Sequence, residues 1–353
     1  MIEDPDFRLT TETAADYAHS AGLFDSHDEL TVRLLAGGVS NAVIRVESAD
    51  RALVLKQPYR RLNVEYEWVI DRSRVWREID GIQQWSRYLG PGWVPEIVHV
   101  DRPSYIYAMT AAPRGARSWK EHLLEGDVSP DVADRVGRAL GTAHRASAED
   151  RSLAERFPMD LFFQARIDPY FVPLTLRYAH LGRVLTSLIR RLFDRRIALV
   201  HGDYSPKNIM VHPSGITILD FEVVHVGDPS FDAAFLASHL ILKTVHAPAH
   251  AAVLMRALET FWTAYCTAYD VAAPSDLEET TIATTGALLL ARVDGKSRVE
   301  YLSSRFKVEL VRAIGTQFLI NPPPTMGDAC RDVVPVMTHS LERGRLARSV
   351  RTP

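Results

Sequence analysis

Three oxygen-bearing side chains in the middle of the sequence have the types and the spacing that phosphoryl transfer requires. Asp203 follows a short apolar run, Asn208 lies five residues later, and Asp220 ends the second of two β-rich runs. Phosphoryl transfer needs a carboxylate near the acceptor hydroxyl and hard oxygen ligands for Mg²⁺ beside the phosphates. We therefore expect Asp203 to take the hydroxyl proton, and Asn208 and Asp220 to hold the metal, with Glu222 as a further ligand or a substrate contact.

Short strands must position these side chains. The apolar run from Ile197 to Val200 leads to Asp203, and two β-rich runs, Ile209–His212 and Ile216–Leu219, flank a Pro-Ser-Gly turn. A strand, a loop and a hairpin with polar groups at the strand ends can collect those groups at one place. Asp and Asn are also common turn residues, so each alone favours an ordinary loop. The three in register favour catalysis.

A glycine turn between two predicted strands is a candidate phosphate cover. The strand Leu30–Leu35 is followed by a turn and by a returning strand, Ala42–Val46. Backbone amides in such a turn can lie over nucleotide phosphates, although the same pattern also makes an ordinary hairpin. The candidate residues of this turn are Gly37, Gly38, Ser40 and Asn41.

Lys56 lies near the end of the third predicted strand, on an otherwise apolar run. A lysine there is costly to bury without a partner, which indicates a contact with the nucleotide phosphates and with a helix glutamate. Glu78, in the helix-like run Asp71–Leu89, is the best candidate partner, and Glu65 and Glu67 are its rivals. The alternative is a lysine on an edge strand that points to water.

A hinge between two lobes is predicted where the strand Tyr105–Met109 runs out into the Pro/Gly segment Ala111–Gly115. The backbone from Tyr107 to Thr110, with Tyr107 and Met109 as the nucleotide-binding residues, would then hydrogen-bond adenine. An ordinary exit from a strand is the alternative.

From Trp119 onward the pattern is mainly helical, with helices predicted over Asp131–Ala146 and Thr175–Phe193. Gly137 and Gly141 would let another helix approach the first of these closely. His144 is interpreted as core packing or a C-cap rather than as a catalytic residue. Asp232 could cap its loop or hold the catalytic segment through backbone hydrogen bonds.

The order of these motifs, from about Leu30 to about Leu240, resembles the aminoglycoside phosphotransferase and choline kinase group. The match lies in the D-x-x-x-x-N spacing of Asp203 and Asn208, in H-G-D where protein kinases have H-R-D, and in D-F-E at Asp220 where they have D-F-G. The resemblance implies an α+β, two-lobed, protein-kinase-like fold. Residues 1–110 would form a nucleotide-binding lobe with an antiparallel sheet, and residues 111–353 a helical catalytic and substrate lobe.

The same resemblance implies the cofactors ATP and Mg²⁺ and transfer of the γ-phosphate to a hydroxyl of a small molecule. The acceptor would be a sugar, an amino alcohol or an aminoglycoside-like compound. The stretch after Lys56, and the D-x-E of Asp220 and Glu222, are also similar to methylthioribose kinases, but the catalytic loop differs from their D-x-H-T-G-S. A methylthioribose-like sugar kinase is therefore one alternative.

Three other functions remain open. A nucleotide-binding pseudokinase would lack transfer, although every expected polar residue is present. A protein kinase is disfavoured because D-F-G and A-P-E segments are missing after Asp220. A metallohydrolase would use His201, Asp203 and His212, which lack a helical H-x-x-x-H arrangement.

Two features bear on the acceptor. Acidic residues could receive a polycation, although acids at the start of a helix also favour its dipole; they are Asp270, Asp276, Glu278 and Glu279. Arg292 could bind a polar substrate, and a solvated helix face is the alternative.

The composition excludes several classes of protein. The 353 residues carry a formal net charge of −3, which gives no basic excess for a nucleic-acid partner. The two cysteines form no disulfide framework or zinc pattern, the acidic N-terminus is no signal peptide, and no run of about 20 apolar residues could span a membrane. We expect a cytoplasmic enzyme whose oligomeric state the sequence leaves open.

Overall fold

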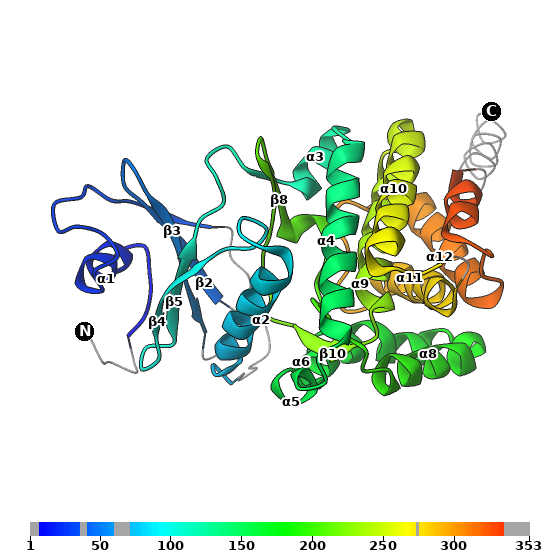
Figure 1. The fold of residues 1–353 in the computed structure, drawn as a ribbon. Coiled ribbons are helices and arrows are strands. Elements are labelled where there is room, and N and C mark those ends of the chain that lie inside the picture. The colour runs from blue at the N-terminus through cyan, green and yellow to red at the C-terminus, as the bar shows by residue number, and fades with distance from the viewer. Residues whose placement is uncertain (1–6, 36–40, 60–70, 273–274, 335–353) are drawn as a thin grey trace. The chain divides into compact units, whose positions relative to one another are not determined.

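The computed structural model describes residues 7–35, 41–59, 71–272 and 275–334. The chain divides into two compact units. Unit 1 is Met1–Gly115 with Thr217–Glu222, and unit 2 is Ala116–Ile216 with Val223–Pro353. The predicted α+β class is confirmed, with an antiparallel sheet in the N-terminal region and a mainly helical remainder (Figure 1). The assignment of nucleotide binding to residues 1–110 and of catalysis to residues 111–353 stays a prediction.

The core of unit 1 is a five-stranded antiparallel sheet with the order β1-β2-β3-β5-β4. Its strands are β1 (Thr31–Leu34), β2 (Asn41–Glu47), β3 (Ala52–Pro58), β4 (Ile97–Asp101) and β5 (Ile106–Thr110). β3 lies between β2 and β5, with Lys56 opposite Val43 on one side and Tyr107 on the other. Lys56 is therefore on an inner strand, and the alternative of an edge-strand lysine is wrong.

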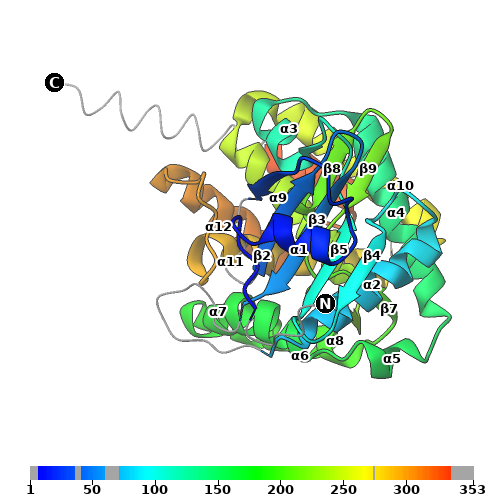
Figure 2. The same ribbon diagram turned by 90° about the vertical axis from the view of Figure 1, so that its left-hand side faces the viewer.

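Two helices flank this sheet, α1 (Ala14–Ser20) and α2 (Arg74–Leu89). Figures 1 and 2 show them on opposite faces of it. Tyr17 and Ala18 of α1 join the apolar cluster that the sheet buries. In α2 the buried residues recur at helical spacing, and Glu78 belongs to the same buried side as Val75 and Ile82. The side chain of Glu78 therefore lies on the buried side of α2.

Unit 2 is built mainly of helices. They are α3 (Trp119–Glu125), α4 (Pro130–Ala148), α5 (Leu153–Arg156), α6 (Asp160–Phe162), the π-helical segment η1 (Phe163–Phe171), α7 (Val172–Arg177), α8 (Gly182–Asp194), α9 (Ser230–His246), α10 (Ala251–Tyr269), α11 (Asp276–Asp294) and α12 (Arg305–Ile320). Nearly every residue of α9 is buried, so this helix forms the centre of the unit.

α4 and α10 approach each other closely at two glycines. A Cβ atom added at Gly137 would lie 2.3 Å from the carbonyl oxygen of Phe261, and one added at Gly141 would lie 2.5 Å from that of Tyr265. The prediction that these glycines permit a close helix contact is confirmed.

Two small sheets complete the fold. The strands β7 (Ala198–Val200) and β10 (His225–Gly227) pair antiparallel, and β6 (Arg117–Ser118), β8 (Ile209–His212) and β9 (Gly215–Ile218) form the second sheet in the order β6-β8-β9. The predicted catalytic strand and hairpin therefore exist at the predicted places.

The single helix predicted over Thr175–Phe193 is wrong. α7 ends at Arg177, Tyr178 has a non-helical ψ of 61°, and a short 3₁₀ turn precedes α8 at Gly182. The apolar spacing continues across the break because both helices pack on the same core, which includes Leu174, Leu181 and Leu185. The apolar periodicity of the sequence therefore gave no sign of the break between α7 and α8.

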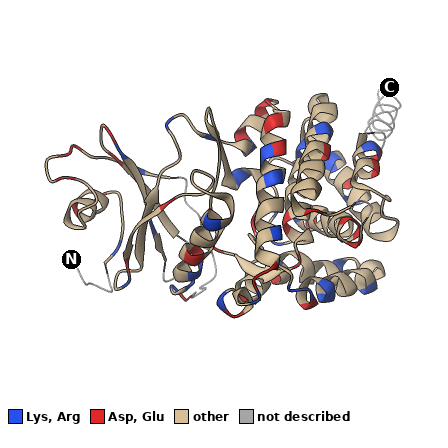
Figure 3. Ribbon diagram, viewed as in Figure 1, with Lys and Arg blue, Asp and Glu red and all other residues tan. Residues whose placement is uncertain are grey.

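Within the described residues, no helix has both the length and the apolar character needed to cross a membrane. Basic and acidic residues are interspersed over the helices of unit 2 (Figure 3).

Candidate active site

Lys56 is the centre of the charged network in unit 1. Its side chain leaves the inner strand β3 and is 4% exposed. Its Nζ atom lies 2.5 Å from Oε1 of Glu78 and 3.1 Å from Oδ1 of Asp220. The structure thus pairs Lys56 with Glu78, while Glu65 and Glu67 lie outside the described residues.

Burial and charge act against each other in this network. Burial alone would lower the pKa of Lys56, but the carboxylates of Asp220 and Glu78 hold it well above its usual value. Burial, aided by Asp220 and Glu222 and opposed by Lys56, raises the pKa of Glu78 to about 7. Three carboxyl groups thus act on one buried ammonium group, so a cation arriving beside Asp220 and Glu222 would relieve their mutual repulsion.

Asp220 lies just after β9, at a φ of +70°. A left-handed backbone is uncommon outside glycine, and Asp and Asn are among the residues that adopt it most easily. The next residue, Phe221, is buried with its ring edge-on to Trp85. This packing fixes the turn, and the carboxyl group of Asp220 stays about one-quarter exposed (23%).

Glu222 accepts a hydrogen bond from Nδ2 of Asn41 at 3.0 Å, and Oδ1 of Asn41 accepts one from Arg74 at 3.4 Å. The first residue of β2 therefore orients the acid that follows Asp220. The other predicted turn residues, Gly37, Gly38 and Ser40, lie outside the described residues.

The predicted hinge lies deeper in the sheet than expected. Tyr107 and Met109 belong to β5, which pairs with β3 on one side and β4 on the other. Their main-chain groups therefore take part in the sheet ladder. The chain leaves the sheet after Ala111, whose amide still donates to the carbonyl oxygen of Ala52. A role of Tyr107 and Met109 in adenine binding stays a prediction, and Ala112 is the first residue beyond this pairing.

In unit 2, Asp232 holds the segment that leads to Asp203. Its fully buried carboxylate accepts hydrogen bonds from the amides of His201 at 2.7 Å and Gly202 at 2.8 Å, and Nε2 of His144 lies 3.2 Å away. Gly202 has a φ of +78°, and a Cβ there would lie 2.6 Å from the carbonyl oxygen of Val223. Asp232 thus holds the segment before Asp203 through backbone hydrogen bonds, as expected, and His144 is a core residue rather than a C-cap.

Asp203 is fixed between an amide and a guanidinium group. Nδ2 of Asn208 donates to Oδ2 of Asp203 at 2.9 Å and to its carbonyl oxygen at 3.0 Å. An ion pair of 3.2 Å joins Oδ1 of Asp203 to Arg166. Because Asn208 uses its nitrogen for both bonds, its side-chain oxygen is left as a potential metal ligand.

Sequence reasoning missed Arg166. It lies in η1, and its Nε atom also donates to the carbonyl oxygen of Gly202 at 2.7 Å. No motif marks this arginine, because its partners are 36 and 37 positions further along the chain and meet it only in the folded unit.

Three of the four acids that could receive a polycation have structural partners. Asp270 pairs with Arg145, and Asp276 pairs with Arg191 and Arg195 at the start of α11. Glu278 is buried and accepts hydrogen bonds from Trp262 and from the amide of Met326. Asp270, Asp276 and Glu278 thus each have a structural partner, and the helix-start interpretation of Asp276 is the better one.

The metallohydrolase alternative gains no support. His201 is buried and its Nδ1 atom accepts a hydrogen bond from the amide of Asp203, whereas Nδ1 of His212 is bonded to Ser214. No group of three His, Cys, Asp or Glu side chains is placed to hold a metal ion in the parts of the chain that the structure describes.

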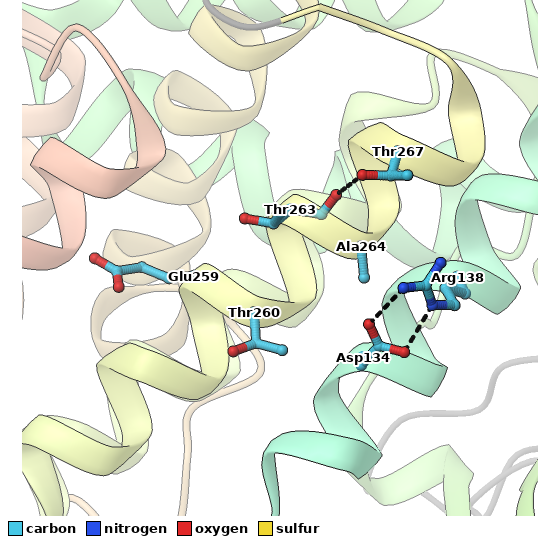
Figure 4. A pocket seen from close by; sticks show the side chains of 7 residues that line it. All are labelled: Asp134, Arg138, Glu259, Thr260, Thr263, Ala264 and Thr267. Atoms are coloured by element: carbon cyan, nitrogen blue, oxygen red, sulfur yellow. Dashed lines mark hydrogen bonds and ion pairs between the residues drawn. The ribbon is translucent and has the colours of Figure 1, made fainter.

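A pocket of about 290 Å³ lies on α4 and α10 and contains none of the predicted site residues (Figure 4). Its polar groups bond largely to their own helices: Arg138 pairs with Asp134, and Thr267 donates to the carbonyl oxygen of Thr263. We assign it no chemistry.

We expect the substitution Asp232→Asn to destabilise the protein strongly. An amide has one acceptor oxygen where the carboxylate has two, and its NH₂ group would face backbone donors, so the loss should be about 3 kcal/mol in the free energy of unfolding. Chemical denaturation at pH 7 measures this loss. Asp194→Asn, at the exposed end of α8, is the matched control and should change little.

The same residue predicts a pH dependence of stability. Burial would raise the pKa of Asp232, but the hydrogen bond and charge of His144 together with the Gly202 amide lower it below the usual 3.8. Its contribution is therefore fully present above about pH 4 and is lost as the pH falls through the lower folded-state pKa. The wild type should lose more stability than Asp232→Asn over that acid range.

Comparison with known proteins decides the family. The model of the phosphotransferase enzyme family, APH, matches residues 31–274. The chain belongs to this family. It is thus a small-molecule kinase with a hydroxyl acceptor and uses ATP, which confirms the predicted enzyme class and the resemblance to aminoglycoside phosphotransferases.

Three relatives illustrate the match. A methylthioribose kinase of Bacillus thuringiensis (strain Al Hakam) is 22% identical over 267 residues, which cover 68% of this chain and 67% of that protein. Spectinomycin phosphotransferase APH(9)-Ia, in complex with ADP and spectinomycin, has a TM-score of 0.54 at 10% identity and covers 93% of this chain and 99% of its own. The amicoumacin kinase hAmiN, in complex with AMP-PNP, Ca²⁺ and Ami, has a TM-score of 0.54 at 14% identity, and the match covers 92% of this chain and 99% of that protein. The two structures confirm the protein-kinase-like fold.

Proposed function

We propose that this kinase transfers the γ-phosphate of ATP to a hydroxyl of a small molecule with Asp203 as the catalytic base. The observation that carries the proposal is the fixed Asp203 carboxylate, held by Asn208 and Arg166 on a segment anchored by Asp232. A base held in this way can orient the acceptor hydroxyl and accept its proton as the oxygen attacks the γ-phosphorus. The bond from that phosphorus to the ADP oxygen then breaks.

We propose Asp220, Glu222 and Asn208 as the ligands of Mg²⁺, because their oxygen atoms are of the kind that this ion prefers. Asp220 and Glu222 of unit 1 would supply carboxylates, and Asn208 of unit 2 would supply the amide oxygen that remains when its nitrogen donates both hydrogen bonds to Asp203. Mg²⁺ takes few protein ligands and completes its shell with water and phosphate oxygens, so a cage of three acidic side chains is not needed. When bound, the ion would neutralise charge on the phosphates. Lys56, kept charged by its neighbours, would contact those phosphates, and the turn of Gly37, Gly38, Ser40 and Asn41 would cover them.

The two alternative functions differ from this one in whether phosphate is transferred and in which acceptor receives it. A pseudokinase would bind nucleotide without transfer, and a methylthioribose-like sugar kinase would use one acceptor among many alcohols. The likeness to the Bacillus kinase supports the second possibility only as an acceptor to be tested. We also propose that the enzyme acts in the cytoplasm.

A screen for ADP release tests this function. The full chain is incubated with ATP, with and without Mg²⁺, and with a panel of sugars, amino alcohols and hydroxy acids that includes methylthioribose. We expect Mg²⁺-dependent ADP release with at least one acceptor. Nucleotide binding, measured as thermal protection, without ADP release on any acceptor would favour the pseudokinase instead.

A further inference from the structure

Among the described residues, neither Lys243 nor Arg292 of unit 2 forms an ion pair with an acidic side chain. Lys243, on the central helix α9, is 1% exposed. Among the described residues, its Nζ atom donates a long hydrogen bond of 3.5 Å to the carbonyl oxygen of His239 and lies 5.6 Å from the ring centre of Tyr301. Arg292, on α11, makes no ion pair with any side chain in the described ranges. A buried ammonium without a carboxylate costs free energy and is uncommon outside functional sites.

One edge of the Arg292 guanidinium group has no hydrogen-bond partner among the described residues. Its Nη1 atom donates to the carbonyl and hydroxyl oxygens of Ser297, both at 2.8 Å, and to the hydroxyl of Tyr170 at 3.3 Å. Its Nε atom is buried and has no partner among the described residues. Nε and Nη2 form the side of the guanidinium group that binds carboxylate or phosphate with two parallel hydrogen bonds. Neither atom of this side donates a hydrogen bond to another residue within the described ranges.

These groups are connected to the proposed base by direct contacts. Arg166, which pairs with Asp203, lies 5.8 Å from the ring centre of Tyr170, and Arg292 lies 5.9 Å from the same ring. Arg166 also lies 5.4 Å from the ring of Phe235, which packs on His239 one helical turn further along α9. Lys243 follows after one more turn, so Phe235, His239 and Lys243 share one face of the helix.

The surroundings of this face are electropositive. Repulsion from Lys120 and Arg292 adds to burial and lowers the pKa of Lys243 to about 7, against a smaller opposing effect of Glu300. Burial and the cations Lys243, Arg292, Lys120 and Arg166 lower the pKa of His239 far below its usual value. The acid Glu300 is itself paired with Lys120 at 2.5 Å. Asp203 is paired with Arg166 and Glu300 with Lys120, so neither acid is paired with Lys243 or Arg292.

We propose that Arg292 and Lys243 form an anion subsite, and that the acceptor is a small molecule that carries a carboxylate or a phosphate in addition to its hydroxyl. This rests on the proposed function, with Asp203 at the hydroxyl. The guanidinium groups of Arg292 and Arg166 both lie against the ring of Tyr170, so the anion subsite adjoins the arginine that holds Asp203. The subsite disfavours cationic acceptors such as aminoglycosides and amino alcohols.

Binding of an anion probe tests the subsite without any transfer. Inorganic phosphate and malonate are titrated into the full chain by calorimetry, in the wild type and in Arg292→Met, Arg292→Lys and Lys243→Met. We expect each substitution at Arg292 or Lys243 to weaken the binding of one or both probes at least about tenfold. The control Arg183→Met, at an exposed position of α8, should leave the affinity for both probes unchanged. Which probe binds more tightly distinguishes a carboxylate from a phosphate acceptor. Equal binding in all variants would overturn the proposal.

Lys243→Met separates a binding role from a structural one. Removing a buried charge that has no acidic partner should raise the unfolding temperature while it weakens anion binding. Malonate stays ionised above pH 6, so its affinity in the wild type should fall as the pH rises past about 7 and Lys243 loses its proton. In Lys243→Met the affinity for malonate should not fall over this pH range. A lower unfolding temperature with unchanged malonate affinity would assign Lys243 to the core alone.

Matched acceptors then connect the subsite to turnover. Glycerate and glycerol 3-phosphate are compared with glycerol, and ribose 5-phosphate with ribose and methylthioribose, by ADP release. In each series that contains a substrate, we expect an anionic member to have a kcat/KM at least about tenfold higher than that of the neutral members. Turnover that favours the neutral sugars would overturn the subsite and leave the kinase function intact, whereas anion binding without any ADP release would overturn the kinase function alone.

Discussion

Asp203→Asn should lower kcat by about a thousandfold, because an amide cannot accept the proton of the acceptor hydroxyl. The change is nearly isosteric. The amide oxygen can still accept the hydrogen bond from Asn208, and the Asp232 contacts that hold the segment are untouched. Nucleotide affinity should therefore stay close to that of the wild type. Steady-state kinetics together with thermal protection by ATP and Mg²⁺ measure both quantities.

The matched control for this experiment is Asp194→Asn, which makes the same chemical change at an exposed position of the same unit. It should keep wild-type kcat. Near-full turnover by Asp203→Asn would show that another group takes the proton, and loss of nucleotide protection would show that the change had damaged the fold instead.

Asp220→Asn should weaken Mg²⁺-dependent ATP binding by at least about tenfold, since the ion would lose a charged ligand. Asn is preferred to Ala here because it tolerates the left-handed backbone at this position, where φ is +70°. The protein without nucleotide should not be destabilised. Three carboxyl groups act on Lys56, and Asp220 is one cause of the raised pKa of Glu78, so removing its charge lowers the repulsion among them.

Calorimetry with ATP at several Mg²⁺ concentrations measures this change, and Glu96→Gln, an exposed acid of unit 1, serves as the control. Unchanged Mg²⁺ dependence in Asp220→Asn would remove Asp220 from the metal site. A large fall in the unfolding temperature would instead mean that its bond to Lys56 is needed for stability.

Motifs with short internal spacing were predictable because their geometry is local. Asp203 and Asn208 are five residues apart on one loop and hydrogen-bond directly, and Lys56 lies on the predicted strand. Strand alternation, turn residues and an apolar run before the acid define such elements without knowledge of the rest of the fold. Errors arose where continuity was assumed, as at Tyr178, where two helices share one core and one apolar period.

The sequence by itself determined the family, the order of the elements and the residues with the chemistry of a kinase. Only the tertiary structure decided which glutamate meets Lys56, that Arg166 holds Asp203, and that Lys243 and Arg292 pair with no acid in the part of the chain that the structure describes. A lysine in the apolar run of α9 was a visible signal, but its meaning depended on its neighbours. The physical reason is that the cost of burying a charge is set by the groups that surround it in space, and these come from distant parts of the chain.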